Sequence, residues 1–259
     1  MSIVQTAKTP NITFKHLHYQ DTPLLVANVW NAHSAALAEK AGFQAVATSS
    51  HAIANALGYE DGEEISVQEL LFIIKRIKAA VRIPVSVDFE AGYSSDPMEV
   101  AEYVKQLVDV GVAGINLEDG IISDGKRLLG DAEDLAEKIR VIKATLDIFI
   151  NARIDTYTTE TPNALEESVR RAHLYQSAGA DGIFVPLMEK EEDIRAFVEK
   201  VKLPLNLFTT KLLPPYDRLA ELGVKRISHG AKQYEQLMKK SEEILVSYLK
   251  TKDYKIVLG

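Results

Sequence analysis

The chain has 259 residues, of which 46% are hydrophobic and 26% charged, and it carries a formal net charge of -7 and no cysteine. The negative charge argues against nucleic acid as a partner, because phosphate binding requires clustered Lys and Arg. Without cysteine the chain has no disulfide, thiolate nucleophile or sulfur-ligated metal site, which agrees with a cytoplasmic location.

The first 21 residues lack the apolar core and small-residue cleavage site of a signal peptide. The longest apolar run, LLFII at residues 70–74, is too short to span a bilayer. We therefore expect neither a secretory leader nor a membrane as a partner.

Short apolar runs rich in β-branched residues recur along the chain, and a longer amphipathic stretch follows each of them. Such continuous runs are typical of strands buried on both faces. The runs cover residues 24–29, 44–49, 85–89, 114–118, 148–153, 182–186, 204–208 and 225–228.

Helical signals fill the intervals between these runs. Val67–Ala80 has apolar residues at helical spacing, and residues 97–110 begin with Asp96 as an N-cap and Pro97 at the first helical position. Residues 165–178 end before Gly179, a residue typical of helix ends. A last helix, about 231–249, has an apolar stripe that can pack on its own barrel or on a second subunit.

Strand followed by helix, eight times, predicts a closed parallel (β/α)8 TIM barrel. We expect residues 1–259 to form a single domain, with the barrel at about 24–230 and the last helix at about 231–249. The rival fold is an open doubly wound sheet. That fold more often has a glycine-rich turn after its first strand, where NVWNAHSA has no glycine.

Active sites of such barrels lie at the carboxyl ends of the strands, so polar residues at these ends are the candidates. Asp88 and Glu90 share a strand face, and Glu118 comes from the next strand. Three close carboxylates repel one another unless a cation lies among them, and Mg²⁺ prefers oxygen ligands. Arg153 has the fork geometry that binds a substrate carboxylate. The other candidates are Thr48, Ser49, Ser50, His51, Asn116, Asp119, Asn151, Asp155, Asn206, Ser228 and His229.

Structural roles compete with these functional ones. An acid at a strand end is often a helix cap, and Asp119 and Asp155 are expected to be capping or structural residues. Arg153 has the alternative role of an ion-pair partner for Glu118. Among the histidines, His229 is the first candidate for a proton donor and His51 the second. The other four, which we expect on the surface, are His16, His18, His33 and His173.

Several segments in order resemble the isocitrate lyase/phosphoenolpyruvate mutase superfamily. They are PVSVDFEAGYSSDP, GVAGINLEDG, FINARIDTY and AGADGIFVPL, with NVWNAHSAALAEKAGFQAVATSS and GYEDGEEIS before them. The resemblance covers roughly residues 24–230. It implies a Mg²⁺-dependent barrel enzyme, with Mn²⁺ as an alternative metal, that cleaves a C–C or P–C bond of a small 2-oxo acid through an enolate.

By this resemblance Asp88 is the main metal ligand, and Glu90 and Glu118 hold the metal largely through water. Asp61 matches a family aspartate near the metal, and Arg153 matches a residue that binds the substrate carboxylate. Trp30, Ser49, Ser50, His51 and Asn206 complete the expected substrate-binding set. In the catalytic set we place Asp61, Arg153 and His229.

The loop after the fourth strand departs from the family. Lyase branches carry a cysteine there, whereas this chain has GIISDGKRLLGDAED with the basic residues Lys126 and Arg127. We therefore expect a lyase or decarboxylase that is not a typical isocitrate or methylisocitrate lyase. The alternatives are a non-catalytic barrel that binds metal and oxo acid, and a metal-dependent aldolase or hydroxymethyltransferase. The resemblance also implies a homo-oligomer, a tetramer or dimer, with the last helix exchanged between subunits.

Overall fold

Eight short strands close into a parallel barrel in the computed structural model, which describes residues 10–123 and 125–258. Around the barrel the strands run in the order β1-β10-β9-β8-β7-β4-β3-β2. This confirms the predicted (β/α)8 barrel and rules out the open sheet. The barrel strands are β1 (Leu24–Val29), β2 (Val46–Thr48), β3 (Val85–Asp88), β4 (Gly114–Glu118), β7 (Phe149–Arg153), β8 (Gly182–Phe184), β9 (Leu205–Phe208) and β10 (Arg226–Ser228).

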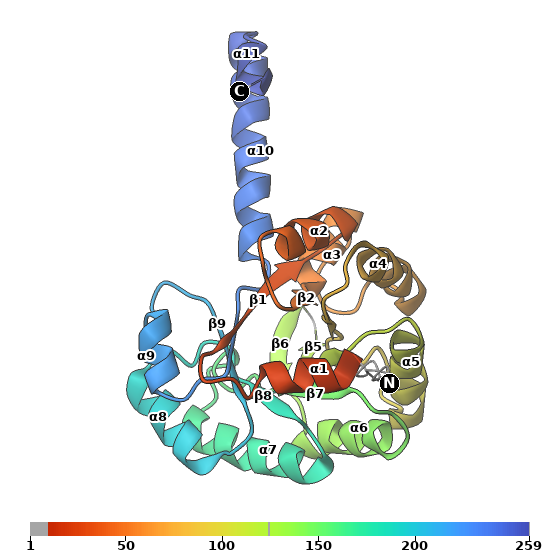
Figure 1. Ribbon diagram of the computed structural model, residues 1–259, viewed down its shortest axis with the longest axis vertical. Helices are drawn as coiled ribbons and strands as arrows, with labels where there is room; N and C mark the ends of the chain where they lie inside the picture. Colours follow the sequence, from red (N-terminus) through yellow and green to blue (C-terminus); the bar gives the residue numbers. More distant parts are fainter. Residues whose placement is uncertain (1–9, 124, 259) are drawn as a thin grey trace, which may run out of the picture.

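A ring of helices surrounds the barrel (Figure 1). Local sequence fixes several helix ends: Ser66 and Glu69 form a capping box at one, and the Asp96 side chain accepts a hydrogen bond from the Met98 N–H at another. Gly179, in the left-handed region at φ 108°, ends a third. The helices are α2 (Ala32–Lys40), α3 (Ser50–Leu57), α4 (Val67–Ala80), α5 (Pro97–Asp109), α6 (Ala132–Thr145), α7 (Ala164–Ala178), α8 (Glu191–Lys200) and α9 (Tyr216–Glu221).

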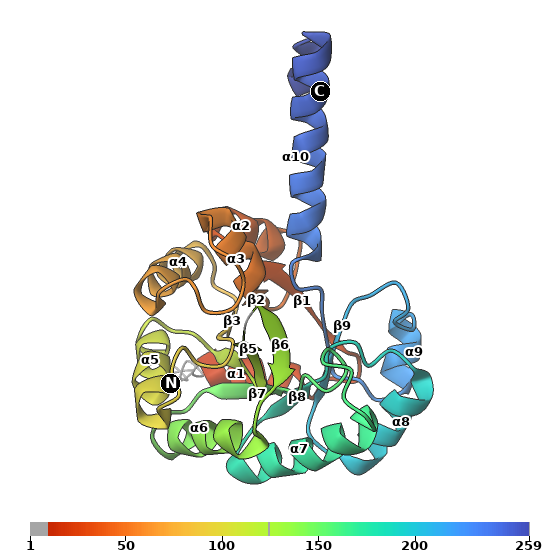
Figure 2. The ribbon, with the colours of Figure 1, turned by 180° about the vertical axis from the view of Figure 1, so that it is seen from behind.

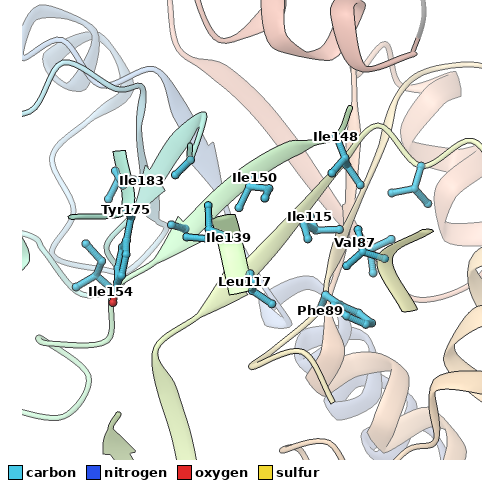
Figure 3. Close-up of a cluster of buried hydrophobic side chains, with 14 of the residues drawn as sticks. Val87, Phe89, Ile115, Leu117, Ile139, Ile148, Ile150, Ile154, Tyr175 and Ile183 are labelled. Carbon is cyan, nitrogen blue, oxygen red and sulfur yellow. The ribbon is translucent and has the colours of Figure 1, made fainter. Parts of the chain in front are cut away.

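The main hydrophobic core lies between the strands and the surrounding helices. Figure 3 shows Ile115 and Ile150, from neighbouring strands, beside Ile139 of α6, and all three are fully buried. Burial of each such side chain contributes roughly 1.5–3 kcal/mol. The helices thus cover the outer faces of the strands, and this packing holds the polar strand ends at one rim.

Helix α1 (Pro10–Leu17) covers the amino-terminal end of the barrel. Its Phe14 ring packs edge-on against Phe149, 5.3 Å between centroids, and fills the space beside Gly114. His18 is 1% exposed and stacks on Phe149 at 4.2 Å, so its predicted surface position is wrong. The reason is that α1 closes the barrel, which residue type alone does not reveal. The predicted surface positions of His16, His33 and His173 are confirmed.

A two-stranded antiparallel hairpin, β5 (Gly120–Ser123) and β6 (Lys126–Leu129), follows β4. Figure 2 shows it across the opposite end of the barrel from α1. The hairpin pairs Ile122 with Arg127 and Gly120 with Leu129. We expected only a loop in this segment, although the Asp-Gly pair between its two short strands is typical of a hairpin turn.

The C-terminal helices α10 (Lys232–Thr251) and α11 (Lys255–Leu258) extend away from the barrel (Figures 1 and 2). Tyr234 is the buried residue of α10, and its hydroxyl donates to Asn55 Oδ1 at 2.7 Å. Leu245 and Leu249, farther along, are 61% and 69% exposed. Beyond Tyr234, the apolar stripe therefore does not pack on its own barrel. Among the described helices, none is both long enough and apolar enough to cross a membrane.

Candidate active site

A cavity of about 260 Å³ opens at the carboxyl ends of the strands. The barrel brings together there residues that are far apart in the sequence, because parallel strands end at one rim. The predicted candidates that line this cavity are Ser49, Ser50, His51, Asp61, Asp88, Asn116, Arg153 and Ser228.

Asp88 and Asp61 present carboxylate oxygens with unsatisfied hydrogen-bonding capacity. Asp88 Oδ2 accepts from the Ser50 hydroxyl at 2.9 Å and from the Ser50 N–H at 3.3 Å. Oδ1 of Asp88 and Oδ1 of Asp61 are buried and have no hydrogen-bond partner in the described structure. Buried carboxylate oxygens without partners are costly, and a bound cation would satisfy them.

Glu90 lies behind these two acids and is 4% exposed. Its carboxylate accepts hydrogen bonds from the Tyr93 hydroxyl at 2.9 Å and from the Glu63 N–H at 3.1 Å. Burial raises the pKa of Glu90 to about 8, and the negative charges of Asp88, Asp61 and Glu118 add to this rise. Excess negative charge is therefore concentrated at this part of the rim.

Glu118 belongs to a closed ring of alternating charges. Its two oxygens contact Arg127 Nη1 at 2.5 Å and Arg153 Nη1 at 2.7 Å. Asp155 completes the ring, with Oδ1 on Arg153 Nε and Oδ2 on Arg127 Nη1, both at 2.8 Å. Burial works to raise the pKa of Asp155, but the two arginines outweigh it and hold the pKa below its ordinary value. The ring is neutral overall and rigidly orients Arg153.

The hairpin after β4 supplies Arg127 to this ring. Close approach is possible because Gly120 has no side chain: a Cβ there would collide with Asp155 Oδ2 and lie 2.6 Å from Arg127 Nη1. The ion pair with Glu118, considered above as the alternative role of Arg153, is present. Arg127 is an additional partner of Glu118 that the sequence did not reveal.

Asp119 lies outside the cavity and has structural partners. Its carboxylate accepts from the Tyr175 hydroxyl at 2.7 Å, from Arg171 at 3.0 Å and from the Asp155 N–H at 2.9 Å. This agrees with the structural role expected for Asp119.

Helix α3 begins at the cavity with Ser49 as its N-cap, whose hydroxyl accepts from the Ala52 N–H. The positive end of a helix favours an anion, such as a carboxylate, at this place. His51, in the first turn, is half exposed, and its Nδ1 lies 3.8 Å from Asp61 Oδ2. A titratable imidazole and a carboxylate thus face the cavity together.

Besides Glu90 and Glu118, three residues predicted for catalysis or substrate binding do not line this cavity. Trp30 and His229 line a neighbouring cavity of about 590 Å³ between α2 and the base of α10. His229 Nε2 accepts from the Asn28 N–H at 3.1 Å, and burial lowers its pKa. Asn206 is 1% exposed and lies below the cavity floor, where it donates to Ser228 Oγ at 3.3 Å.

The cavity also contains residues that the sequence did not single out. Thr158, from the loop after β7, and Glu235, from α10, lie too far from any strand end to be recognised. Phe184 and Phe208 are inward-facing strand residues, and an aromatic residue in an apolar run is indistinguishable from core. The additional lining residues are Asn28, Thr158, Phe184, Pro186, Leu187, Phe208, Gly230, Ala231 and Glu235.

The acidic side chains fit a hydrated cation better than a fully ligated one. In the described residues, no three histidine or acidic side chains are arranged to ligate one metal together. Mg²⁺ commonly keeps several waters and uses one or two carboxylates plus substrate oxygens. The unpartnered oxygens of Asp61 and Asp88 match that donor set, whereas both oxygens of Glu118 already contact arginines.

Comparison with known proteins extends over most of the chain. The family model described as phosphoenolpyruvate phosphomutase matches residues 14–249. An uncharacterised protein of Mycobacterium tuberculosis is 33% identical over 223 residues, which cover 86% of this chain and 83% of that protein. The 2-methylisocitrate lyase of Aeropyrum pernix is 31% identical over 246 residues, which cover 91% and 79%.

Solved structures give the same result. A Burkholderia cenocepacia protein described as a candidate phosphonomutase has a TM-score of 0.85 and 37% identity, over 91% of this chain and 98% of that one. A phosphonopyruvate hydrolase in complex with oxalate and Mg²⁺ has a TM-score of 0.85 and 23% identity, over 95% and 89%. At that identity the second likeness shows the fold alone.

Proposed function

This chain belongs to the phosphoenolpyruvate phosphomutase family, within the isocitrate lyase/phosphoenolpyruvate mutase superfamily, and from that membership we propose a Mg²⁺-dependent enzyme. Its substrate is a small 2-oxo acid or related carboxylate, and it cleaves a C–C or P–C bond through an enolate. The specific reaction proposed is that of a lyase or decarboxylase. The observation that carries the proposal is the pair of unpartnered carboxylate oxygens beside Arg153 in one cavity.

Asp88 and Asp61 would hold the metal, and Glu90 would contact it through water. Charge supports this assignment, since these acids have no cation among the hydrogen-bond and ion-pair partners described for them, apart from the His51 contact of Asp61. Bound Mg²⁺ supplies Lewis-acid stabilisation of the enolate oxygen. Mn²⁺ has similar oxygen preferences and is the alternative metal.

Arg153 and the start of α3 would bind the substrate. Arg153 lines the cavity, and the charge ring fixes its guanidinium before a ligand arrives, so little side-chain entropy is lost on binding. The Ser49 hydroxyl and the N-terminus of α3 offer donors for a second group of carboxylate oxygens, while the Ser50 hydroxyl and N–H already donate to Asp88 and orient it. A small anion with two carboxylates, or a carboxylate and a neighbouring oxo group, matches this arrangement.

His51 is the residue we propose for proton transfer to the enolate carbon. It lines the cavity beside Asp61, whereas His229 lines the neighbouring one. The hairpin, which follows β4 where lyases carry their cysteine, has no thiol to offer. The lack of a thiol supports a reaction other than typical isocitrate or methylisocitrate cleavage. The Aeropyrum pernix relative is nevertheless named 2-methylisocitrate lyase.

The test is a panel of 2-oxo acids and 2-hydroxy diacids with Mg²⁺, in which release of pyruvate or CO2 is followed. Chelation of the metal and Asp88→Ala should each abolish turnover. Asp109→Ala, which removes an exposed acid on α5 paired with Lys105, is the matched control and should retain it. Full turnover without metal, or by Asp88→Ala, would refute the proposal.

A second candidate is a barrel that binds metal and oxo acid without turnover. The charge ring favours it, because Arg127 and Glu118 are bound to each other and neither is free for proton transfer. In that case oxalate would raise the Tm only with Mg²⁺, and no member of the panel would be converted.

We also propose that α10 docks on a second copy of the chain, giving a dimer or tetramer. The outer face of β1 supports this: Leu25 is 47% exposed and lies with Phe43 and Tyr216 in a shallow cavity of about 270 Å³. The exposed stripe of α10 offers apolar side chains of the kind that such a surface accepts. Light scattering measures the oligomeric state, and a monomeric mass would refute the docking of α10 on a second copy of the chain.

A further inference from the structure

Arg226 of β10 is a buried arginine inside the barrel. It is 1% exposed, and none of its three guanidinium nitrogens has a hydrogen-bond partner among the described residues. Its backbone pairs with Leu24 of β1 and Asn206 of β9. Ser228, two residues farther along the same strand face, lines the active-site cavity. Arg226 therefore belongs to the layer of side chains directly beneath that cavity.

The side chain extends over the Phe14 ring, with its Cζ 5.7 Å from the ring centroid. Phe14 itself fills the space beside Gly114 of β4, across the barrel from β10. The guanidinium thus lies within the barrel interior rather than at its wall. Ser86 Oγ of β3 and Asn206 Oδ1, also buried, have no hydrogen-bond partner either.

The burial of the Arg226 charge without an ion-pair partner does not stabilise the folded state. Buried charges are normally paired, and an unpaired one weakens the fold because water no longer solvates it. The cation–π contact with Phe14 offsets only part of this loss. Burial lowers the pKa of Arg226 to about 10, which leaves the guanidinium charged at neutral pH. A charge that costs stability without forming hydrogen bonds indicates a use in the site above it.

The charge of Arg226 acts on groups toward both ends of the barrel, His18 at the amino-terminal end and Asp88 at the rim. Asp88 lines the cavity, and its negative charge interacts electrostatically with Arg226. Arg127 and Arg153 are neutralised by Glu118 and Asp155, so their charges are largely balanced within the ring. Arg226 has no such partner within residues 10–123 and 125–258. In the protein interior, where the dielectric constant is lower than in water, its field is screened less than that of an exposed charge.

We propose that Arg226 is a positioning residue that acts through its charge: from beneath the cavity it offsets the carboxylates and favours binding of a small dianion, such as a 2-oxo diacid, beside the metal. This inference rests on the proposed function and specifies, in addition, that the substrate carries two negative charges. The residue touches neither metal nor substrate. Its selectivity is for a doubly charged ligand over a singly charged one, because the interaction scales with ligand charge.

The experiment measures binding of oxalate and of acetate with Mg²⁺ by calorimetry, and the Tm of each variant. Arg226→Met removes the charge with little change of volume, and Arg226→Lys keeps it. Arg218→Met is the matched control, since it removes an exposed arginine paired with Glu191 and Glu221.

Arg226→Met is expected to raise the Tm in the absence of ligand while it weakens oxalate binding at least about tenfold. Acetate binding should weaken less, and Arg226→Lys should stay within about threefold of the unmodified protein. If Arg226→Met binds oxalate within about twofold of the unmodified protein, the inference about Arg226 is overturned and the proposed function is not affected. Failure of the unmodified protein to bind oxalate with Mg²⁺ would overturn the proposed function and this inference with it.

Discussion

The charge ring predicts a specific loss of stability in Arg127→Met. The substitution removes one member of the ring and leaves Glu118 and Asp155, 4% and 0% exposed, with Arg153 as their common partner. Breaking a buried ion pair from one side costs about 3–5 kcal/mol. Arg127 is 21% exposed, so we expect the lower end, about 3 kcal/mol. For a chain of this size that corresponds to a fall in Tm of roughly 6–12 °C.

Urea unfolding without metal, followed by circular dichroism, measures this loss. The matched control is Arg140→Met, which removes an exposed arginine of α6 paired with Glu133 and Glu137 and should leave the free energy of unfolding nearly unchanged. The double variant Arg127→Met/Glu118→Gln should be more stable than Arg127→Met, because one uncompensated charge is gone. Equal effects of Arg127→Met and Arg140→Met would refute the ring as a stabilising unit.

Three further outcomes are expected. Gly120→Ala should destabilise the protein about as much as Arg127→Met, because its Cβ would displace Asp155 and Arg127; an unchanged Tm would contradict this. Without metal, the free energy of unfolding should fall by up to about 4 kcal/mol as the pH rises from 5 to 8. The folded state keeps Glu90 protonated up to its raised pKa of about 8, while the unfolded chain ionises near its ordinary value. Urea titrations at both pH values measure the fall, and Glu90→Gln should reduce it, while burial of Glu118, which raises its pKa to about 7, contributes a fall of the same sign. Leu245→Glu should shift an oligomer toward smaller species in light scattering, whereas an unchanged mass would count against docking through this face of α10.

Local sequence predicted the strands closely because they are short, apolar and bounded by turn residues. The predicted strands at 24–29 and 114–118 coincide with β1 and β4, and Val67–Ala80 coincides with α4. Among the residues predicted at the strand ends, Ser50 and Asp88 line one cavity, whereas Glu90 and Glu118 lie outside its lining. These results depend on periodicity and on the rule that parallel strands end together, both of which the sequence contains.

Other features could not be predicted in this way. His18 and Arg226 are polar side chains inside the barrel, and burial depends on which helix covers which end. The arginine in KRIS was nevertheless a signal, because a charge within an otherwise buried strand is as unusual as Asp88 in VSVD. The hairpin after β4 was missed although an Asp-Gly pair typical of a two-residue hairpin turn separates its strands, because these strands are short and their apolar residues Ile121 and Ile122 are exposed.

The sequence by itself determined the barrel, its strand ends and the acids at the rim, because each follows from local pattern and from a general rule of parallel sheets. Only the tertiary structure decided which of those acids pair with arginines and which keep oxygens without a partner. It pairs Glu118 and Asp155 with two arginines, leaves oxygens of Asp61 and Asp88 unpartnered, and puts Arg226 beneath them. The physical reason is that Coulomb interactions depend on distance and burial, and these are fixed by side chains that meet only when eight strands close into one ring.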